Sequence, residues 1–193
     1  MIIGITGGTG CGKTTLLDVI RDQGGLVLDC DEIYHRLLQS SQSLQQAIEA
    51  RFPGTVTNEG VDRKKLGAIV FADAQALADL NRITHSAVKE QILSQLENAP
   101  ALAAIDAIGL FEGHLDSLCD VTVAVTAPRE DRIARLVARE NITPAYAQLR
   151  IDAQRSNEEF AALCDHVLAN DKSREQFQQK CLAFLESLGI MKV

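Results

Sequence analysis

The chain has 193 residues, of which 46% are hydrophobic and 23% are charged, an ordinary composition for a globular protein that can bury one full core. Its formal net charge of −7 argues against a nucleic-acid partner, because phosphate backbones select clustered Lys and Arg, but it leaves small anionic ligands open. The five cysteines show neither CxxC pairs nor zinc spacing, so we expect free thiols. Without a recognisable signal peptide or membrane span, we expect a cytoplasmic protein with no membrane partner.

Short apolar runs alternate with longer helical patterns along the chain. This alternation is typical of βα units and predicts an α/β fold with a parallel sheet. We expect the strands to be covered on both faces, as short apolar strands of parallel sheets are. Their predicted ranges are 2–6, 26–29, 101–107, 121–126 and 166–169.

The first predicted strand leads into a glycine-rich loop and then a helix. Residues 7–14 match GxxxxGK[ST] in the strand–loop–helix context that this phosphate-binding motif requires. Glycines let the backbone wrap a polyphosphate with its N–H groups pointing inward, and the helix N-terminus adds a favourable dipole. Lys13 should reach the terminal phosphates, and the Thr14 hydroxyl should hold Mg²⁺. The residues expected to bind ATP here are Gly8, Gly10, Cys11, Gly12, Lys13, Thr14 and Thr15.

Carboxylates follow the second and third predicted strands. Ligands of open α/β sheets bind at the carboxyl ends of the strands, so Asp29 and Asp31 should face the phosphate loop. We assign Asp31 as the general base that accepts a proton from an acceptor hydroxyl, and Asp29 as a helix cap. Asp106 ends the third strand, where a carboxylate can orient magnesium, although a strand-terminal Asp can also be an ordinary turn residue.

The stretch between the second and third strands is long and mainly helical. Turn signals at 52–54 and 57–60 interrupt it, and helices are predicted at 62–71 and 73–97. This is too much chain for a simple crossover, so we expect a subdomain beside the sheet.

A second insertion, after the fourth strand, is rich in arginine. Between Pro128 and Arg155 there are six arginines and no lysine. Three of them, Arg132, Arg135 and Arg139, lie on one face of a predicted helix. Forked guanidinium donors suit phosphate oxygens, so this segment is typical of a lid that closes over ATP, with Arg139 making the catalytic contact. A solvated helix stabilised by ion pairs is the alternative.

Beyond the glycine loop, an ordered set of segments resembles the dephospho-coenzyme A kinase family. Residues 4–15 are similar to its opening G-L-T-G-G-x-G-S-G-K-S-T. The other segments are Leu28-Asp29-Cys30-Asp31-Glu32-Ile33 (D-A-D-x-I), Leu80-Asn81-Arg82-Ile83-Thr84-His85 (L-E-x-I-T-H-P), Leu110-Phe111-Glu112 (L-L-F-E), Arg135 to Arg139 with Arg150 to Gln154 (R-x-x-x-R, R-I-x-x-Q) and Cys164 to Asn170 (A-D-x-V-I-x-N). The resemblance covers nearly the whole chain.

The resemblance implies a P-loop kinase with a three-layer α/β/α core around a five-stranded parallel sheet. The core would comprise residues 1–35, 99–127 and 160–193, the helical coenzyme-binding insertion 36–98, and the arginine-rich lid 128–159. The implied reaction is Mg²⁺- and ATP-dependent phosphorylation of the ribose 3′-hydroxyl of dephospho-coenzyme A, the last step of coenzyme A synthesis. We expect a monomer or a weak homo-oligomer.

By matched position, the resemblance also implies roles for single residues. Asp31 would be the base, Lys13 and Arg139 the phosphate ligands, and Arg135 a further contact to ATP. Asp31, His85, Phe111 and Glu112 would lie near the acceptor. The chain departs from the family at three places. Residues 107–109 lack the usual proline, and Ser86 stands where a second proline usually follows the histidine. Residues 157–160 lack the usual lysine. These changes affect the expected shape of the acceptor pocket.

Other functions fit parts of the same pattern. Another P-loop kinase, for a nucleoside, a nucleotide or a small metabolite, would also explain the loop, Asp31 and the arginines. A GTPase-like switch would account for DxxG at 106–109, but residues 170–172 give the guanine-binding N-K-x-D in the wrong order. A non-catalytic ATP-binding module is disfavoured because Lys13, Thr14, Asp31 and the arginines occur together.

Overall fold

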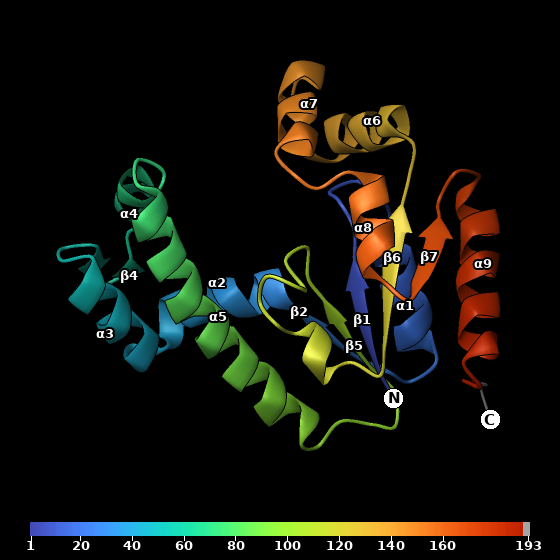
Figure 1. Cartoon of the computed structure of the whole chain (residues 1–193), viewed down its shortest axis with the longest axis horizontal. Helices are drawn as coiled ribbons and strands as arrows, with labels where there is room; N and C mark the ends of the chain where they lie inside the picture. Colours follow the sequence, from blue (N-terminus) through green and yellow to red (C-terminus); the bar gives the residue numbers. More distant parts are fainter. Residues whose placement is uncertain (191–193) are drawn as a thin grey trace. The chain divides into compact units, whose positions relative to one another are not determined.

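The computed structural model describes residues 1–190, and the chain divides into two compact units (Figure 1). The first unit contains Met1–Leu28 and the chain from Ala99 onward, and the second contains Asp29–Asn98. None of the helices in residues 1–190 is long and apolar enough to cross a membrane.

The first unit is built on a sheet that, within the described residues, has five strands in the order β2-β5-β1-β6-β7. The strands are β1 (Ile2–Thr6), β2 (Leu26–Asp29), β5 (Ala103–Asp106), β6 (Val121–Thr126) and β7 (His166–Ala169). β1 pairs in parallel with β5 and β6, and β6 with β7. The expected parallel α/β sheet is therefore confirmed, with the third strand two residues shorter at its start and one at its end.

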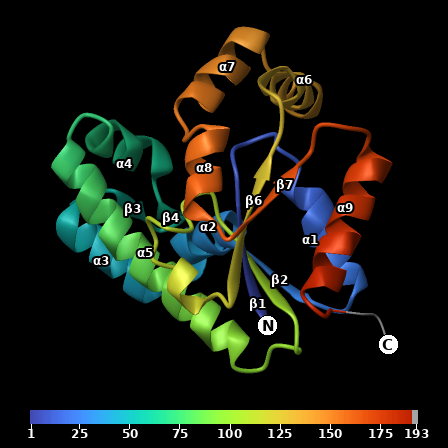
Figure 2. The ribbon, with the colours of Figure 1, turned by 45° about the vertical axis from the view of Figure 1, so that its right-hand side comes forward.

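One face of this sheet is covered by α1 (Lys13–Asp22) and α9 (Arg174–Ser187), which lie side by side (Figure 2). Ile3 and Ile5 alternate along β1 and point into this layer, where both are fully buried. They pack with Leu16 and Ile20 of α1 and with Phe177 of α9. This apolar layer holds the first turn of α1, and with it the preceding glycine loop, at the carboxyl end of the central strand.

The opposite face of β1 is approached very closely by the segment after β5. A Cβ atom on Gly4 would lie 2.8 Å from Cys119 Sγ and 3.0 Å from Leu110 Cδ2, so a side chain at this position would force its neighbours apart. α8 (Asn157–Leu163) packs against β6, and its Phe160 is 1% exposed. Helices and turns thus cover both faces around the central strands, which gives three layers.

The edge strand β7 departs from the sequence prediction. We expected every strand to be covered on both faces, but His166 and Val167 are exposed, Val167 by 46%. β7 pairs on one side with β6 and ends the sheet, so its first residues stay exposed although the His166 ring contacts Phe184 of α9. An apolar run alone does not distinguish a central strand from an edge strand.

The arginine-rich insertion forms a pair of helices, α6 (Arg129–Glu140) and α7 (Pro144–Asp152), with a small core of its own. Ile133 and Leu136 of α6 pack against Ala147 and Ile151 of α7. Asn141 ends α6 in the left-handed conformation. Each helix alone presents one apolar stripe, and the stripes bury each other.

The second unit contains the helices α2 (Cys30–Ser40), α3 (Gln42–Arg51), α4 (Arg63–Val70) and α5 (Ala74–Leu96), and the short strands β3 (Val56–Thr57) and β4 (Gly60–Val61). α5 packs against α2, α3 and α4. The two helices predicted at 62–71 and 73–97 are confirmed as α4 and α5. The β3–β4 hairpin was not predicted, because its two-residue strands have no detectable period.

All five cysteines are free thiols, and three of them, Cys11, Cys30 and Cys181, are buried. Burial raises the pKa of the Cys119 and Cys181 thiols to about 12 and that of Cys164 to about 11. Burial also raises the pKa of Cys11, in spite of the nearby Lys13.

These raised pKa values predict slow thiol chemistry in the native protein, because the thiolate is the reactive form and is scarce well below the pKa. At about pH 8, we expect Ellman's reagent to modify Cys119, Cys164, Cys181 and Cys11 at least about tenfold more slowly than in urea, where all five thiols are accessible. Mass spectrometry of the labelled peptides identifies the modified sites. Rapid labelling of any of these four in the folded protein would contradict the assignment.

Candidate active site

The glycine loop between β1 and α1 adopts a backbone that needs glycine at several positions. Gly7, Gly10 and Gly12 have φ values of 138°, 77° and 100°. Gly12 is also the N-cap of α1, and no side chain caps this helix. The first N–H groups of α1 therefore have no side-chain acceptor, and together with the helix dipole they suit an anion.

Lys13 folds back over this loop and meets a carboxylate. Its Nζ donates to the carbonyl oxygen of Gly7 at 3.1 Å and lies 3.9 Å from Asp106 Oδ1. The two side chains are only 14% and 13% exposed. They meet because β5 lies next to β1, with Ile5 opposite Asp106. Asp106 and Thr14 offer the carboxylate and hydroxyl oxygens that Mg²⁺ prefers, and Mg²⁺ needs only one or two protein ligands, so the residues fit this ion.

Arg132 of α6 is buried against the loop, with 3% exposure. Its Nε donates to the carbonyl oxygen of Thr9 at 2.9 Å, and its Nη2 donates to Gln154 Oε1 at 3.3 Å. Gln154 Oε1 also accepts the N–H of Thr9 at 2.8 Å. Burial lowers the pKa of the Arg132 guanidinium, but an arginine stays charged in proteins. The arginine-rich insertion and the loop are thus joined through the backbone N–H and C=O groups of Thr9.

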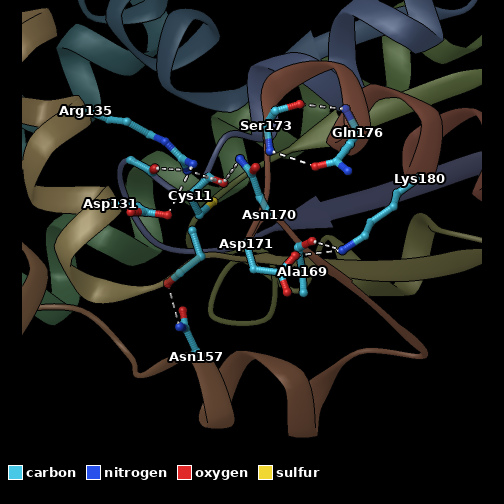
Figure 3. A network of polar contacts seen from close by, with 12 residues as sticks. Cys11, Asp131, Arg135, Asn157, Ala169, Asn170, Asp171, Ser173, Gln176 and Lys180 are labelled. Carbon is cyan, nitrogen blue, oxygen red and sulfur yellow. Dashed lines mark hydrogen bonds and ion pairs between the residues drawn. The ribbon is translucent and has the colours of Figure 1, made fainter.

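Arg135, one turn further along α6, also bonds the loop backbone. Its Nη1 donates to the carbonyl oxygens of Gly10 at 3.2 Å and of Cys11 at 3.4 Å, and its Nη2 lies 3.8 Å from Asp131 Oδ2 (Figure 3). Its side chain is 36% exposed. The Arg135 guanidinium therefore lies on the side of the loop that these carbonyl oxygens face.

Arg139, at the end of α6, is 60% exposed and pairs with its neighbour Glu140 at 2.6 Å. Arg150 of α7 contacts the other oxygen of the same carboxylate. The hydrogen bonds from Arg139 and Arg150 hold the pKa of Glu140 below its usual range. The end of α6 therefore carries the exposed Arg139, which shares one carboxylate with the half-buried Arg150 of α7.

The segment after β5 contains Phe111 and Glu112. Glu112 Oε1 accepts a hydrogen bond from Arg155 Nε at 2.8 Å, which links this segment to the residues before α8. The departure from the family at 107–109 lies just before it. There, the Thr6 hydroxyl donates to the carbonyl oxygen of Ile108 at 3.0 Å, and so anchors the backbone that has no proline.

Asp31 and His85 belong to the second unit. Asp31 is exposed in the first turn of α2, and His85 is half-buried on α5. Asp29 is the N-cap of α2, and its Oδ1 accepts the N–H groups of Asp31 at 2.9 Å and Glu32 at 3.0 Å. The prediction that Asp29 caps this helix is confirmed.

Three residues that contact the loop were not singled out from the sequence. Arg132 appeared only as one of three arginines on a helix face, Gln154 only as a letter of the resemblance, and Asn170 only there and in the rejected guanine-binding motif. The amide of Asn170 donates to the carbonyl oxygen of Cys11 at 2.9 Å. The resemblance contained the only signal for Gln154 and Asn170, because their positions in sequence lie 145 and 159 residues from their partners in the loop.

Gly8 provides a test of the contact between Arg132 and the loop. A Cβ atom on Gly8 would lie less than 3.0 Å from the guanidinium of Arg132, which has no room to move because it is buried. We expect Gly8→Ala to displace Arg132 from Thr9 and Gln154, to lower the free energy of unfolding by about 1 to 3 kcal/mol and to weaken nucleotide binding.

Gly67→Ala is the matched control. A Cβ atom on this α4 residue would meet nothing closer than 3.5 Å, so alanine should be neutral or stabilise the protein by up to about 1 kcal/mol. Urea unfolding and nucleotide titrations measure both variants. Equal stability of the two variants would mean that Arg132 does not require glycine at position 8.

Comparisons with known proteins agree with this geometry. A family model described as dephospho-CoA kinase matches residues 1–176. The dephospho-CoA kinase of Latilactobacillus sakei is 35% identical over 191 residues, which are 96% of this chain and 95% of that protein. The crystal structure of TT1252 from Thermus thermophilus matches with a TM-score of 0.82 at 31% identity over 97% of both chains. The dephospho-CoA kinase from Campylobacter jejuni matches with a TM-score of 0.68 at 25% identity over 98% of both. The expected P-loop kinase fold is confirmed, and the chain belongs to the dephospho-CoA kinase family.

Proposed function

We propose that this protein transfers the γ-phosphoryl group of ATP to the ribose 3′-hydroxyl of dephospho-coenzyme A, giving coenzyme A and ADP. The observation that carries the proposal is the family match over residues 1–176, which includes the glycine loop and its lysine. Kinases of this family use ATP. The buried approach of Lys13 to Asp106 supports a site for a phosphate chain with its metal ion.

The loop residues Gly8 to Thr15 would hold the phosphates through their N–H groups, and Lys13 would contact the terminal ones. Thr14 and Asp106 would hold Mg²⁺, which neutralises phosphate charge when bound. Lys13 is well placed for this role because Gly7 and Asp106 already hold its ammonium over the loop. Positioning and charge neutralisation should provide most of the acceleration, since phosphoryl transfer needs little covalent help.

Arg139 is proposed as the lid residue that reaches the transferring phosphoryl group. Arg139 can leave Glu140 without leaving this carboxylate unpaired, because Arg150 remains bound to it. Closing of the lid, residues 128–159, would bring this exposed guanidinium to the phosphates. Arg135 would stay on the loop backbone and support the ATP side from there.

By matched position, the insertion 36–98 is proposed to bind the acceptor, and Phe111 and Glu112 are proposed as further acceptor-binding residues. Within this proposal, Asp31 accepts the proton of the attacking 3′-hydroxyl as its oxygen bonds the γ-phosphorus and the bond to ADP breaks. His85 is proposed as another acceptor-binding residue. We also propose a cytoplasmic location, which the five free thiols support.

An acceptor panel tests the proposed reaction. We expect ATP with Mg²⁺ to phosphorylate dephospho-coenzyme A, but not adenosine, nucleoside monophosphates or shikimate. ADP release measured for each acceptor, with mass spectrometry of the products, provides the readout. Phosphate transfer to one of the other acceptors in preference to dephospho-coenzyme A would overturn the acceptor assignment and leave the P-loop kinase assignment intact.

Asp31→Asn tests the proposed base, because the amide keeps the shape of the side chain but cannot accept the proton. Turnover should fall by about two to four orders of magnitude, while ATP affinity stays nearly unchanged. The matched control is Glu32→Gln, an exposed carboxylate in the same first turn of α2, which should keep close to full turnover. Unchanged turnover in Asp31→Asn, or an equal loss in Glu32→Gln, would remove Asp31 from this role.

A further inference from the structure

Three consecutive carbonyl oxygens of the glycine loop each accept a hydrogen bond from a side chain elsewhere in the first unit. Arg132 holds that of Thr9. Arg135 contacts those of Gly10 and Cys11. Asn170 donates through Nδ2 to that of Cys11, and Figure 3 shows Arg135 and Asn170 both directed at Cys11.

Holding a carbonyl group also orients the N–H group of the same peptide. A trans peptide is planar, and its C=O and N–H bonds point in opposite directions. When Arg135 and Asn170 hold the carbonyl oxygen of Cys11 on their side of the loop, the N–H of Gly12 must therefore face the opposite side. Gly12, with φ at 100°, has the freedom to turn this peptide, so without such a hold its orientation would be weakly determined.

The fit of Asn170 against the loop is close and specific. Asn170 is 6% exposed, and its own N–H donates to the carbonyl oxygen of Thr126 at the end of β6 at 2.8 Å. A Cβ atom at position 12 would lie less than 3.0 Å from Asn170 Nδ2, so this hydrogen bond requires glycine there. Only the amide nitrogen can donate to a carbonyl oxygen, which sets the orientation of the side chain.

The chain around Asn170 is held by other contacts. Lys180 Nζ donates to the carbonyl oxygen of Ala169 and to Asp171 Oδ1, both at 2.8 Å (Figure 3). Ser173 and Gln176 form a capping box at the start of α9. These contacts stabilise the segment between β7 and α9 without touching the phosphate loop, whereas the side chain of Asn170 bonds the loop directly.

We propose that Asn170 is a positioning residue for the phosphate donor: by holding the carbonyl oxygen of Cys11, it keeps the N–H of Gly12 aimed at the phosphates before ATP binds. Binding then does not have to order this peptide, so affinity is gained without direct contact between Asn170 and ATP. The inference rests on the proposed function only in that the loop holds ATP phosphates, and it does not depend on the acceptor.

The test compares Asn170→Ala with Lys180→Gln in the full-length protein. The first variant removes the donor to the loop without adding charge, and the second removes an exposed support of the same segment that does not contact the loop. The probes are ADP and inorganic tripolyphosphate, which has no base, both followed by calorimetry. We expect Asn170→Ala to bind both about tenfold more weakly and Lys180→Gln to bind both like the parent protein.

The KM for dephospho-coenzyme A should stay unchanged in Asn170→Ala, while the KM for ATP rises about tenfold. Normal tripolyphosphate binding by Asn170→Ala would show that Asn170 acts only on binding of the adenine base. An equal loss of binding in Lys180→Gln would show that Asn170 acts only through the stability of the fold. Either result would overturn the proposal. If the parent protein uses another acceptor, the two binding measurements still decide the role of Asn170.

Asn170→Leu is the second variant, because it has a similar volume and also lacks the donor, without adding charge. If Asn170→Ala does not fold by urea unfolding, Asn170→Leu replaces it in both binding measurements. A loss of about tenfold for ADP and for tripolyphosphate supports the proposal. Binding of tripolyphosphate like that of the parent protein would overturn it.

Discussion

The direction of the peptide groups in the loop at residues 7–14 is the constraint on which the rest of the first unit depends. For the N–H groups to face a phosphate chain, the carbonyl groups must face the protein, where a buried oxygen without a donor is costly. Arg132, Arg135 and Asn170 provide those donors from α6 and from the end of β7. The glycines at 8 and 12 leave the space that these side chains need. The side chains that bind the loop carbonyl oxygens thus fix the direction of the N–H groups that would bind the anion.

This constraint divides the arginines of the insertion that contains α6 and α7 into two groups. Arg132 and Arg135 are bound to the loop, whereas Arg139 and Arg150 lie near the end of α6 and share Glu140. α6 is thus anchored to the phosphate loop through Arg132 and Arg135, while Arg139 at its end stays exposed. The low exposure of Arg132 and the small separate core of α6 and α7 support this division.

Departures from the family pattern are accommodated by local hydrogen bonds. Where the family has proline after the third strand, the chain is held by the Thr6 hydroxyl on Ile108, and Glu112 is tied to Arg155. Proline restricts φ, whereas these bonds fix the same segment through its contacts. The shape of the segment near Phe111 therefore depends on side chains from β1 and from the residues before α8.

The phosphate loop, the five strands and the cap at Asp29 could be predicted from the residues alone, because they follow from local spacing and from the period of apolar residues. The same spacing placed Arg132, Arg135 and Arg139 on one helix face. It could not tell which of them would be buried, since periodicity orients a face but does not show what lies opposite. That Arg132 and Asn170 bind loop carbonyls, across 123 and 159 residues of chain, and that β7 is an exposed edge, became visible in the fold, because both depend on how distant segments pack.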